Sequence, residues 1–138
     1  NKTFGNIRLI QRSSRYNRTH WRRGVLDRLV KERFIDDSRY ADAYVREKSH
    51  LSVWGARKIA MHLRQKGVDK NVIDEALKQL DGEKELSGLV EKLRRKIPVT
   101  KHSTEYELRG KLLRYALSLG FDYDMAIQAV DAAVDATN

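Results

Sequence analysis

Two adjacent acids, Asp36 and Asp37, are the residues of this sequence that most suggest a chemical site. Paired carboxylates can carry out acid–base chemistry or hold a metal ion, but either use needs a partner that shifts one pKa. No His lies near the pair in the sequence. The alternative is structural, with Asp36 as the N-cap of a helix, Ile35 and Tyr40 as its hydrophobic staple, and Asp37 in its first turn. We expect this structural role.

The sequence also lacks the residues that other common catalytic mechanisms need. The chain has no Cys, so it has neither disulfides nor a thiolate nucleophile, and it has no Gly-rich phosphate loop. Its four histidines have no ligand spacing between them. We therefore expect no catalytic residue, no metal and no cofactor, and a protein that is not an enzyme. A metal-dependent nuclease that uses Asp36 and Asp37 stays open as an alternative.

The charge is strongly positive and unevenly placed. The 138 residues include 28 Lys and Arg against 19 Asp and Glu. Residues 1–66 carry 17 basic and 6 acidic side chains, whereas residues 67–138 carry 11 and 13. The first part therefore favours an anionic partner. No apolar run approaches the roughly 20 residues of a membrane span, and the lack of Cys suits a reducing compartment, so we expect a cytoplasmic protein that binds no membrane.

Apolar residues recur at helical spacing along almost the whole chain, which predicts an all-α protein of about eight helices. Helices are expected over residues 21–30 and 37–49 as two separate elements. Two Gly-apolar-Asp triplets, residues 67–69 and 120–122, each predict a left-handed Gly that ends one helix and an Asp that caps the next. Thr104 and Glu107 have the spacing of a capping box.

These joints reveal an internal repeat. A shift of 53 residues places Lys58 on Lys111, and a shift of 47 places residues 25–27 on residues 72–74. Three small helices bury little surface alone, so tandem units are expected to stack side by side. The expected units are a partial first repeat over residues 1–35 that holds its second and third helices, a second repeat over 36–81, and a third over 82–138.

Several motifs resemble the bacterial RecX family, which regulates the RecA recombinase. They are FIDDSRYA over residues 34–41 with YV at 44–45, WGARKI over 54–59, LRQKGV over 63–68 and IDEAL over 73–77. The tail, KLLRYA over 111–116 followed by Gly120 and Phe121, resembles the last repeat of that family. The resemblance covers roughly residues 25–134. It weakens over residues 1–20, where His20 stands in place of the usual joint glycine.

The resemblance implies an elongated, curved array of three-helix repeats. It also implies a regulator of DNA repair, recombination and the SOS response that binds along the RecA–DNA filament and limits recombinase activity. Direct affinity for single- and double-stranded DNA is implied as well. We expect a monomer. A general nucleic-acid-binding helical module is the alternative, and its affinity would fall steeply with salt.

The candidate binding residues are basic, because a cationic face is what an anionic filament requires. Trp54, beside Gly55, is a candidate for base stacking, whereas Trp21 is expected to be packed. A second basic cluster over residues 92–96 is interpreted as compensation of a helix dipole. The expected filament- or DNA-binding face comprises Arg22, Arg23, Arg28, Arg39, Arg46, Lys48, Arg57, Lys58, Arg64 and Lys66.

Overall fold

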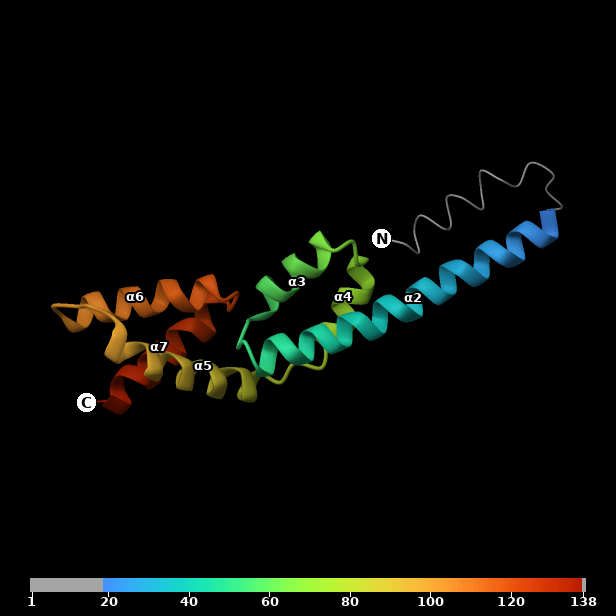
Figure 1. Cartoon of the computed structure of the whole chain (residues 1–138). Helices are drawn as coiled ribbons and strands as arrows, with labels where there is room; N and C mark the ends of the chain where they lie inside the picture. Colours follow the sequence, from blue (N-terminus) through green and yellow to red (C-terminus); the bar gives the residue numbers. More distant parts are fainter. Residues whose placement is uncertain (1–18, 138) are drawn as a thin grey trace.

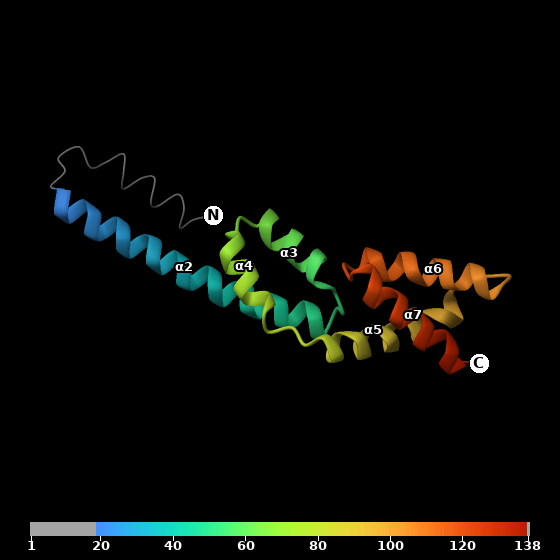
Figure 2. The same cartoon turned by 180° about the vertical axis from the view of Figure 1, so that it is seen from behind.

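The computed structural model describes residues 19–137, and the side chains of residues 23–136, as an elongated set of helices (Figures 1 and 2). The all-α prediction is confirmed, and the described part contains no strand. The expected second helix of the first repeat lies outside the described residues. The elements are α2 (Thr19–His50), α3 (Ala56–Gln65), α4 (Lys70–Leu77), α5 (Gly82–Lys96), the 3-10 turn η1 (Ile97–Val99), α6 (Glu105–Ser118) and α7 (Tyr123–Thr137).

The predicted break before Asp36 is wrong, because α2 runs without interruption from Thr19 to His50. Asp36 and Asp37 therefore lie within a helix and cap nothing. Ile35 and Tyr40 are 41% and 43% exposed, so they form no buried staple. No Gly or Pro interrupts residues 30–40, and the i,i+4 ion pair of Arg33 with Asp37 at 3.6 Å supports a continuous helix. An Asp at this position favours a cap but cannot force a helix to end.

Two hydrophobic clusters hold the helices together. One joins the C-terminal half of α2 to α3 and α4, and its buried members run from Ala41 to Ala76. The other joins α5, α6 and α7 through buried residues from Leu89 to Val134. The N-terminal half of α2 extends beyond both clusters (Figure 1), and it carries the exposed Val30 and Phe34. The expected unit boundary after residue 35 falls inside α2, and the extent of the units stays a prediction.

The predicted joints are largely as expected. Gly67 and Gly120 both have positive φ, at 86° and 95°, which an L side chain adopts only with strain. The Asp122 carboxylate accepts a hydrogen bond from the Met125 backbone N–H at 2.8 Å, as a cap does. Asp69 occupies the N-cap position of α4, but its side chain makes no cap bond there.

The Thr104 cap expected at the start of α6 forms, but the reciprocal bond differs from that of a capping box, because Glu107 accepts from Ser103, the residue before the cap. The Thr104 hydroxyl accepts from the Glu107 N–H at 3.1 Å, and the Glu107 carboxylate accepts from the Ser103 N–H at 3.0 Å. The hydrogen bond from Ser103, and then the one from Lys111, lowers the pKa of Glu107.

A backbone junction connects the two clusters, and we call it the Gly55–Gly120 junction. The Gly55 N–H donates to the Leu119 carbonyl at 2.7 Å, and the Arg57 N–H donates to the Gly120 carbonyl at 3.2 Å. The backbone carbonyls of Leu119 and Gly120, which follow α6, thus cap the first turn of α3. No side chain forms a cap hydrogen bond there. A Cβ at Gly55 would overlap the carbonyl group of Gly120, and one at Gly120 would lie 2.5 Å from the backbone nitrogen of Lys58. Only glycine permits this approach.

Gly55→Ala should destabilise the protein, because its methyl group overlaps backbone atoms that cannot move aside alone. We expect a loss of about 1–3 kcal/mol in the free energy of unfolding, measured by urea denaturation. Gly24→Ala is the control, since a Cβ there meets no atom of the described residues within 4 Å and Ala favours a helix interior. Equal midpoints for Gly55→Ala and the unmodified chain would contradict the junction.

Candidate nucleic-acid interface

A row of aromatic rings lies where α2, α3 and the loop between them meet. The Tyr40 and Tyr44 ring centroids are 5.8 Å apart, Tyr44 meets the edge of Trp54 at 6.5 Å, and Trp54 lies 4.7 Å from His62. Trp54 is partly buried and packs against both hydrophobic clusters. The Trp54 backbone N–H donates to the Lys48 backbone carbonyl at 2.9 Å, which fixes the loop to the end of α2.

Three lysines lie over these rings, and we call Lys48, Lys58 and Lys66 the ring-contacting lysines. The Nζ atoms of Lys48 and Lys58 are 4.8 and 4.4 Å from the Trp54 ring centroid. Those of Lys48 and Lys66 are 5.4 and 6.0 Å from the Tyr44 ring. Such cation–π contacts are worth about 0.5–1 kcal/mol each at exposed sites, so the rings hold the ammonium groups together. Burial raises the pKa of Tyr44, and the charge of Lys66 opposes that rise.

The ring-contacting lysines remain available to an anion. Within residues 23–136 none of them forms a salt bridge with an acid. A cation that lies on a ring, without a carboxylate, can still accept a phosphate or carboxylate from a partner. This geometry also affects the stacking of a nucleic-acid base that is expected at Trp54. Two lysines and His62 already contact its ring, so a base that stacks there has to displace them.

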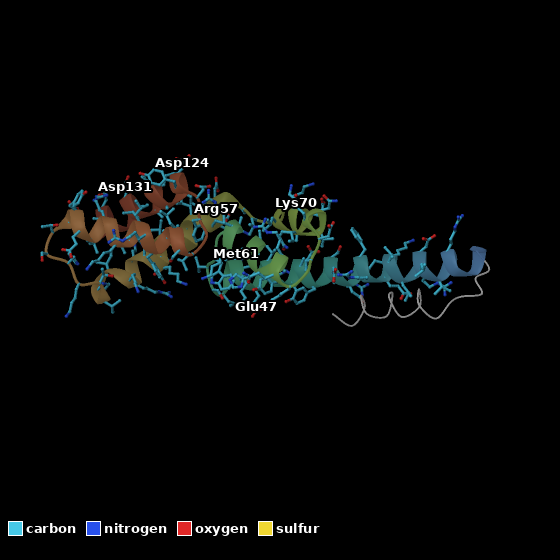
Figure 3. The ribbon with its side chains drawn as sticks, turned by 90° about the horizontal axis from the view of Figure 1, so that it is seen from above. Glu47, Arg57, Met61, Lys70, Asp124 and Asp131 are labelled. Carbon is cyan, nitrogen blue, oxygen red and sulfur yellow. The ribbon has the colours of Figure 1, made fainter. Side chains whose placement is uncertain are left out.

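The remaining residues of the expected basic face fall on separate surfaces. Arg57 and Arg64 are exposed and lie seven residues apart on α3, about two turns, so they share one face (Figure 3 labels Arg57). Arg39 and Arg46 repeat this spacing on α2, on the side away from the buried Ala41 and Val45. The structure therefore does not bring all the expected residues together. Arg23 and Arg28 are exposed on the N-terminal half of α2, and the side chains of Arg22 and Trp21 lie outside the described residues.

The surface of α3 differs from that of α2 in its charge balance. The helix sequence ARKIAMHLRQ contains three Lys and Arg and no acid, and Lys66 follows it directly. On α2 the arginines alternate with acids such as Asp42 and Glu47. Neighbouring acids screen a basic side chain, so α3 presents a less neutralised cationic surface than α2.

Two lysines of the basic cluster over residues 92–96 make contacts outside α5, and Lys92 reaches the loop between α2 and α3. Lys92 Nζ donates to the Ser52 carbonyl at 2.6 Å, and Lys96 Nζ lies 4.6 Å from the Tyr115 ring centroid. Burial lowers the pKa of Lys92, and the charge of Lys58 lowers it further. Sequence reasoning interpreted this cluster only as dipole compensation. The signal that could have separated these two lysines from their neighbours is their i,i+4 spacing, which puts both on one face of α5.

Asp36 and Asp37 do not converge on one point. Consecutive residues of a helix point about 100° apart, and Asp37 already pairs with Arg33. No group of three or more His, Asp and Glu side chains in the described part of the chain has the geometry to hold a metal ion. None of the helices between residues 19 and 137 combines the length and the apolar character that crossing a membrane demands.

Comparison with known proteins places this fold and these motifs in one family. The family model "RecX, second three-helix domain" matches residues 36–77. A curated "Regulatory protein RecX" of Clostridium botulinum (strain Eklund 17B / Type B) is 36% identical over 114 residues, which are 80% of this chain and 52% of the relative. That of Finegoldia magna is 33% identical over 106 residues, which are 75% of this chain and 52% of the relative. The chain thus spans about half the length of the curated relatives it matches.

A solved structure supports the fold independently. The crystal structure of RecX from Lactobacillus salivarius superposes with a TM-score of 0.71 and 23% sequence identity, covering 89% of this chain and 79% of the other. At this identity the likeness establishes the shared helical fold.

Replacing Lys58 with Gln should raise the pKa of Lys92, because a nearby positive charge is removed. The pKa should stay below its ordinary value of 10.5, since burial still disfavours the charged ammonium. NMR titration of the Lys92 side chain measures the change. Lys78→Gln, at an exposed lysine paired with Glu75, is the control that should leave Lys92 unaffected. An unchanged pKa in Lys58→Gln would contradict the electrostatic contact between the two units.

Proposed function

Because the chain belongs to the RecX family, we propose that it is a non-enzymatic regulator that binds the RecA–DNA filament and inhibits the recombinase. The observation that carries this proposal is the surface of α3, on which Arg57, Lys58, Arg64 and Lys66 are accompanied by no acid. The filament carries the phosphates of its DNA, and a cationic surface gains affinity by replacing their counterions. The curated relatives are named regulatory proteins, which supports a role without catalysis.

The elongated shape suits a partner that is itself extended. In Figures 1 and 2 the unit of α5, α6 and α7 and the unit of α3, α4 and the end of α2 follow one another along one axis, and α2 continues beyond them. A chain of this form can contact successive subunits of a filament, and contacts of modest strength then add up. We propose that it acts as a monomer in the cytoplasm, where it also binds free single- and double-stranded DNA.

A second candidate function is general nucleic-acid binding without filament recognition. The ring-contacting lysines favour it, because they place unpaired cations beside aromatic rings. In that case inhibition would require enough protein to coat the bare DNA.

The matched pairs Arg57→Gln/Arg64→Gln and Arg39→Gln/Arg46→Gln test the proposal. Both remove two exposed arginines seven residues apart, and therefore the same charge. The α3 pair should weaken inhibition about tenfold, since each lost phosphate contact costs affinity, whereas the α2 pair should have little effect. The assay is DNA-dependent ATP hydrolysis by preformed RecA filaments on single-stranded DNA, titrated with each variant.

Binding to bare single-stranded DNA, measured beside this assay, separates the two functions. Filament recognition predicts inhibition at concentrations that leave the bare DNA largely free. Inhibition that only follows coating of the DNA would support the general binder. Equal inhibition by the α3 pair and the unmodified chain would remove the α3 surface from the proposal.

A further inference from the structure

A hollow lies at the boundary between the two units, beside the loop between α2 and α3. It has a volume of about 470 Å³, within the roughly 300–1,000 Å³ of small-ligand sites. One wall comes from the loop, and the other comes from α5, η1 and α6. We call it the junction groove and define it by Leu51, Val53, Lys92, Lys96, Val99 and Tyr115.

The walls of the junction groove expose apolar side chains to water from both sides. Leu51 is 79% exposed and Val99 is 74% exposed, although they belong to different units. A single exposed aliphatic residue is common on protein surfaces. Two that line one hollow form an apolar surface, and a bound group that covers it gains free energy from the burial.

The loop is also held in a strained conformation at the groove. Val53 has a φ of 53°, in the left-handed region that β-branched residues avoid at a cost of about 1–3 kcal/mol. Hydrogen bonds fix the next two residues, from Trp54 to the Lys48 carbonyl and from Gly55 to the Leu119 carbonyl. The Gly55–Gly120 junction therefore helps to fix the position of the loop residues that form this wall of the groove.

The groove carries positive charge that no acid neutralises. Its acid, Glu91, pairs with Arg94 and Arg95 at 3.6 and 3.7 Å. Lys92 and Lys96 instead contact the Ser52 carbonyl and the Tyr115 ring, and among the described side chains neither forms a salt bridge. An anion bound here would find two ammonium groups already in place, one turn apart on α5.

Lys92 and Lys96 extend the group of ring-contacting lysines across the boundary between the two units. Lys66 and Lys48 share the Tyr44 ring, and Lys48 and Lys58 share the Trp54 ring. Lys58 in turn lies close enough to Lys92 to lower its pKa. A row of single cations that crosses from one unit to the next suits a polyanion with regularly spaced charges.

We infer that the junction groove binds single-stranded nucleic acid, with an unstacked base against Leu51, Val53 and Val99 and its phosphates on Lys92 and Lys96. The inference deepens the proposed function and rests on it for the choice of nucleic acid as partner. A single strand fits because every base has a flat face that packs on apolar side chains. A duplex keeps its bases paired and stacked, so it cannot reach the walls of the groove.

The variant Leu51→Ser/Val99→Ser tests this site, because both side chains are exposed and the charge stays the same. Fluorescence anisotropy of a labelled oligo-dT should show affinity reduced about tenfold, as expected for a lost base contact, with the dependence on salt unchanged. Binding of a duplex of equal length should not change. Val30→Ser/Leu117→Ser, at residues that are 54% and 37% exposed outside the groove, is the matched control and should bind as the unmodified chain does.

An abasic oligonucleotide of the same length isolates the base contact. The unmodified chain should bind it less tightly than oligo-dT, and Leu51→Ser/Val99→Ser should not weaken that binding further. Equal affinity of this variant and the unmodified chain for oligo-dT would overturn the inference. So would a variant that loses only filament inhibition, because the groove would then serve a protein partner.

If the chain does not regulate RecA, the inhibition and oligo-dT measurements give a different combination of results. If the unmodified chain does not inhibit RecA filaments but its oligo-dT affinity still depends on Leu51 and Val99, the regulatory role falls. The single-strand site then stands on its own.

Discussion

The backbone contact between Gly55 and Gly120 is the constraint on which the rest of the structure depends. It lets the first turn of α3 take its hydrogen-bond acceptors from the end of α6, so that one unit caps a helix of its neighbour. It also determines the course of the loop that carries Val53 and Trp54. Because Trp54 packs against both hydrophobic clusters, the junction is closed by side chains as well as by the backbone.

The distribution of charge follows from this arrangement. Trp54 is held at the boundary and brings Lys48 of α2 and Lys58 of α3 to one ring. Lys92 of α5 reaches across to the loop, so cations of two units lie close together. In the C-terminal unit, by contrast, Arg109 is neutralised by Asp131 and Asp135. Among the described residues, lysines that contact rings or carbonyls without a carboxylate partner therefore gather around the boundary between the two clusters.

Local sequence signals predicted most of the fold and less of the site. Gly67, Gly120 and the Thr104 cap were readable because their chemistry acts within a few residues. The continuity of α2 does not follow from local signals, because the N-cap preference of Asp36 favours a break even though no Gly or Pro interrupts residues 30–40. The basic residues were identifiable by type, but their division among faces depends on packing. The roles of Gly55, Val53 and Lys92 require contacts between residues about 35 to 65 positions apart, and no local pattern encodes them.

If the Gly55–Gly120 junction fixes the two units into one body, spin labels on the two units should lie at one fixed distance. The chain has no native Cys, so Asn71→Cys on α4 and Gln128→Cys on α7 can be labelled at exposed positions in different units. Pulsed electron–electron double resonance should give a single narrow distance distribution, the same with and without a single-stranded oligonucleotide. A broad or two-peaked distribution would show that the units move independently, and that the Gly55–Gly120 junction does not fix them to one another.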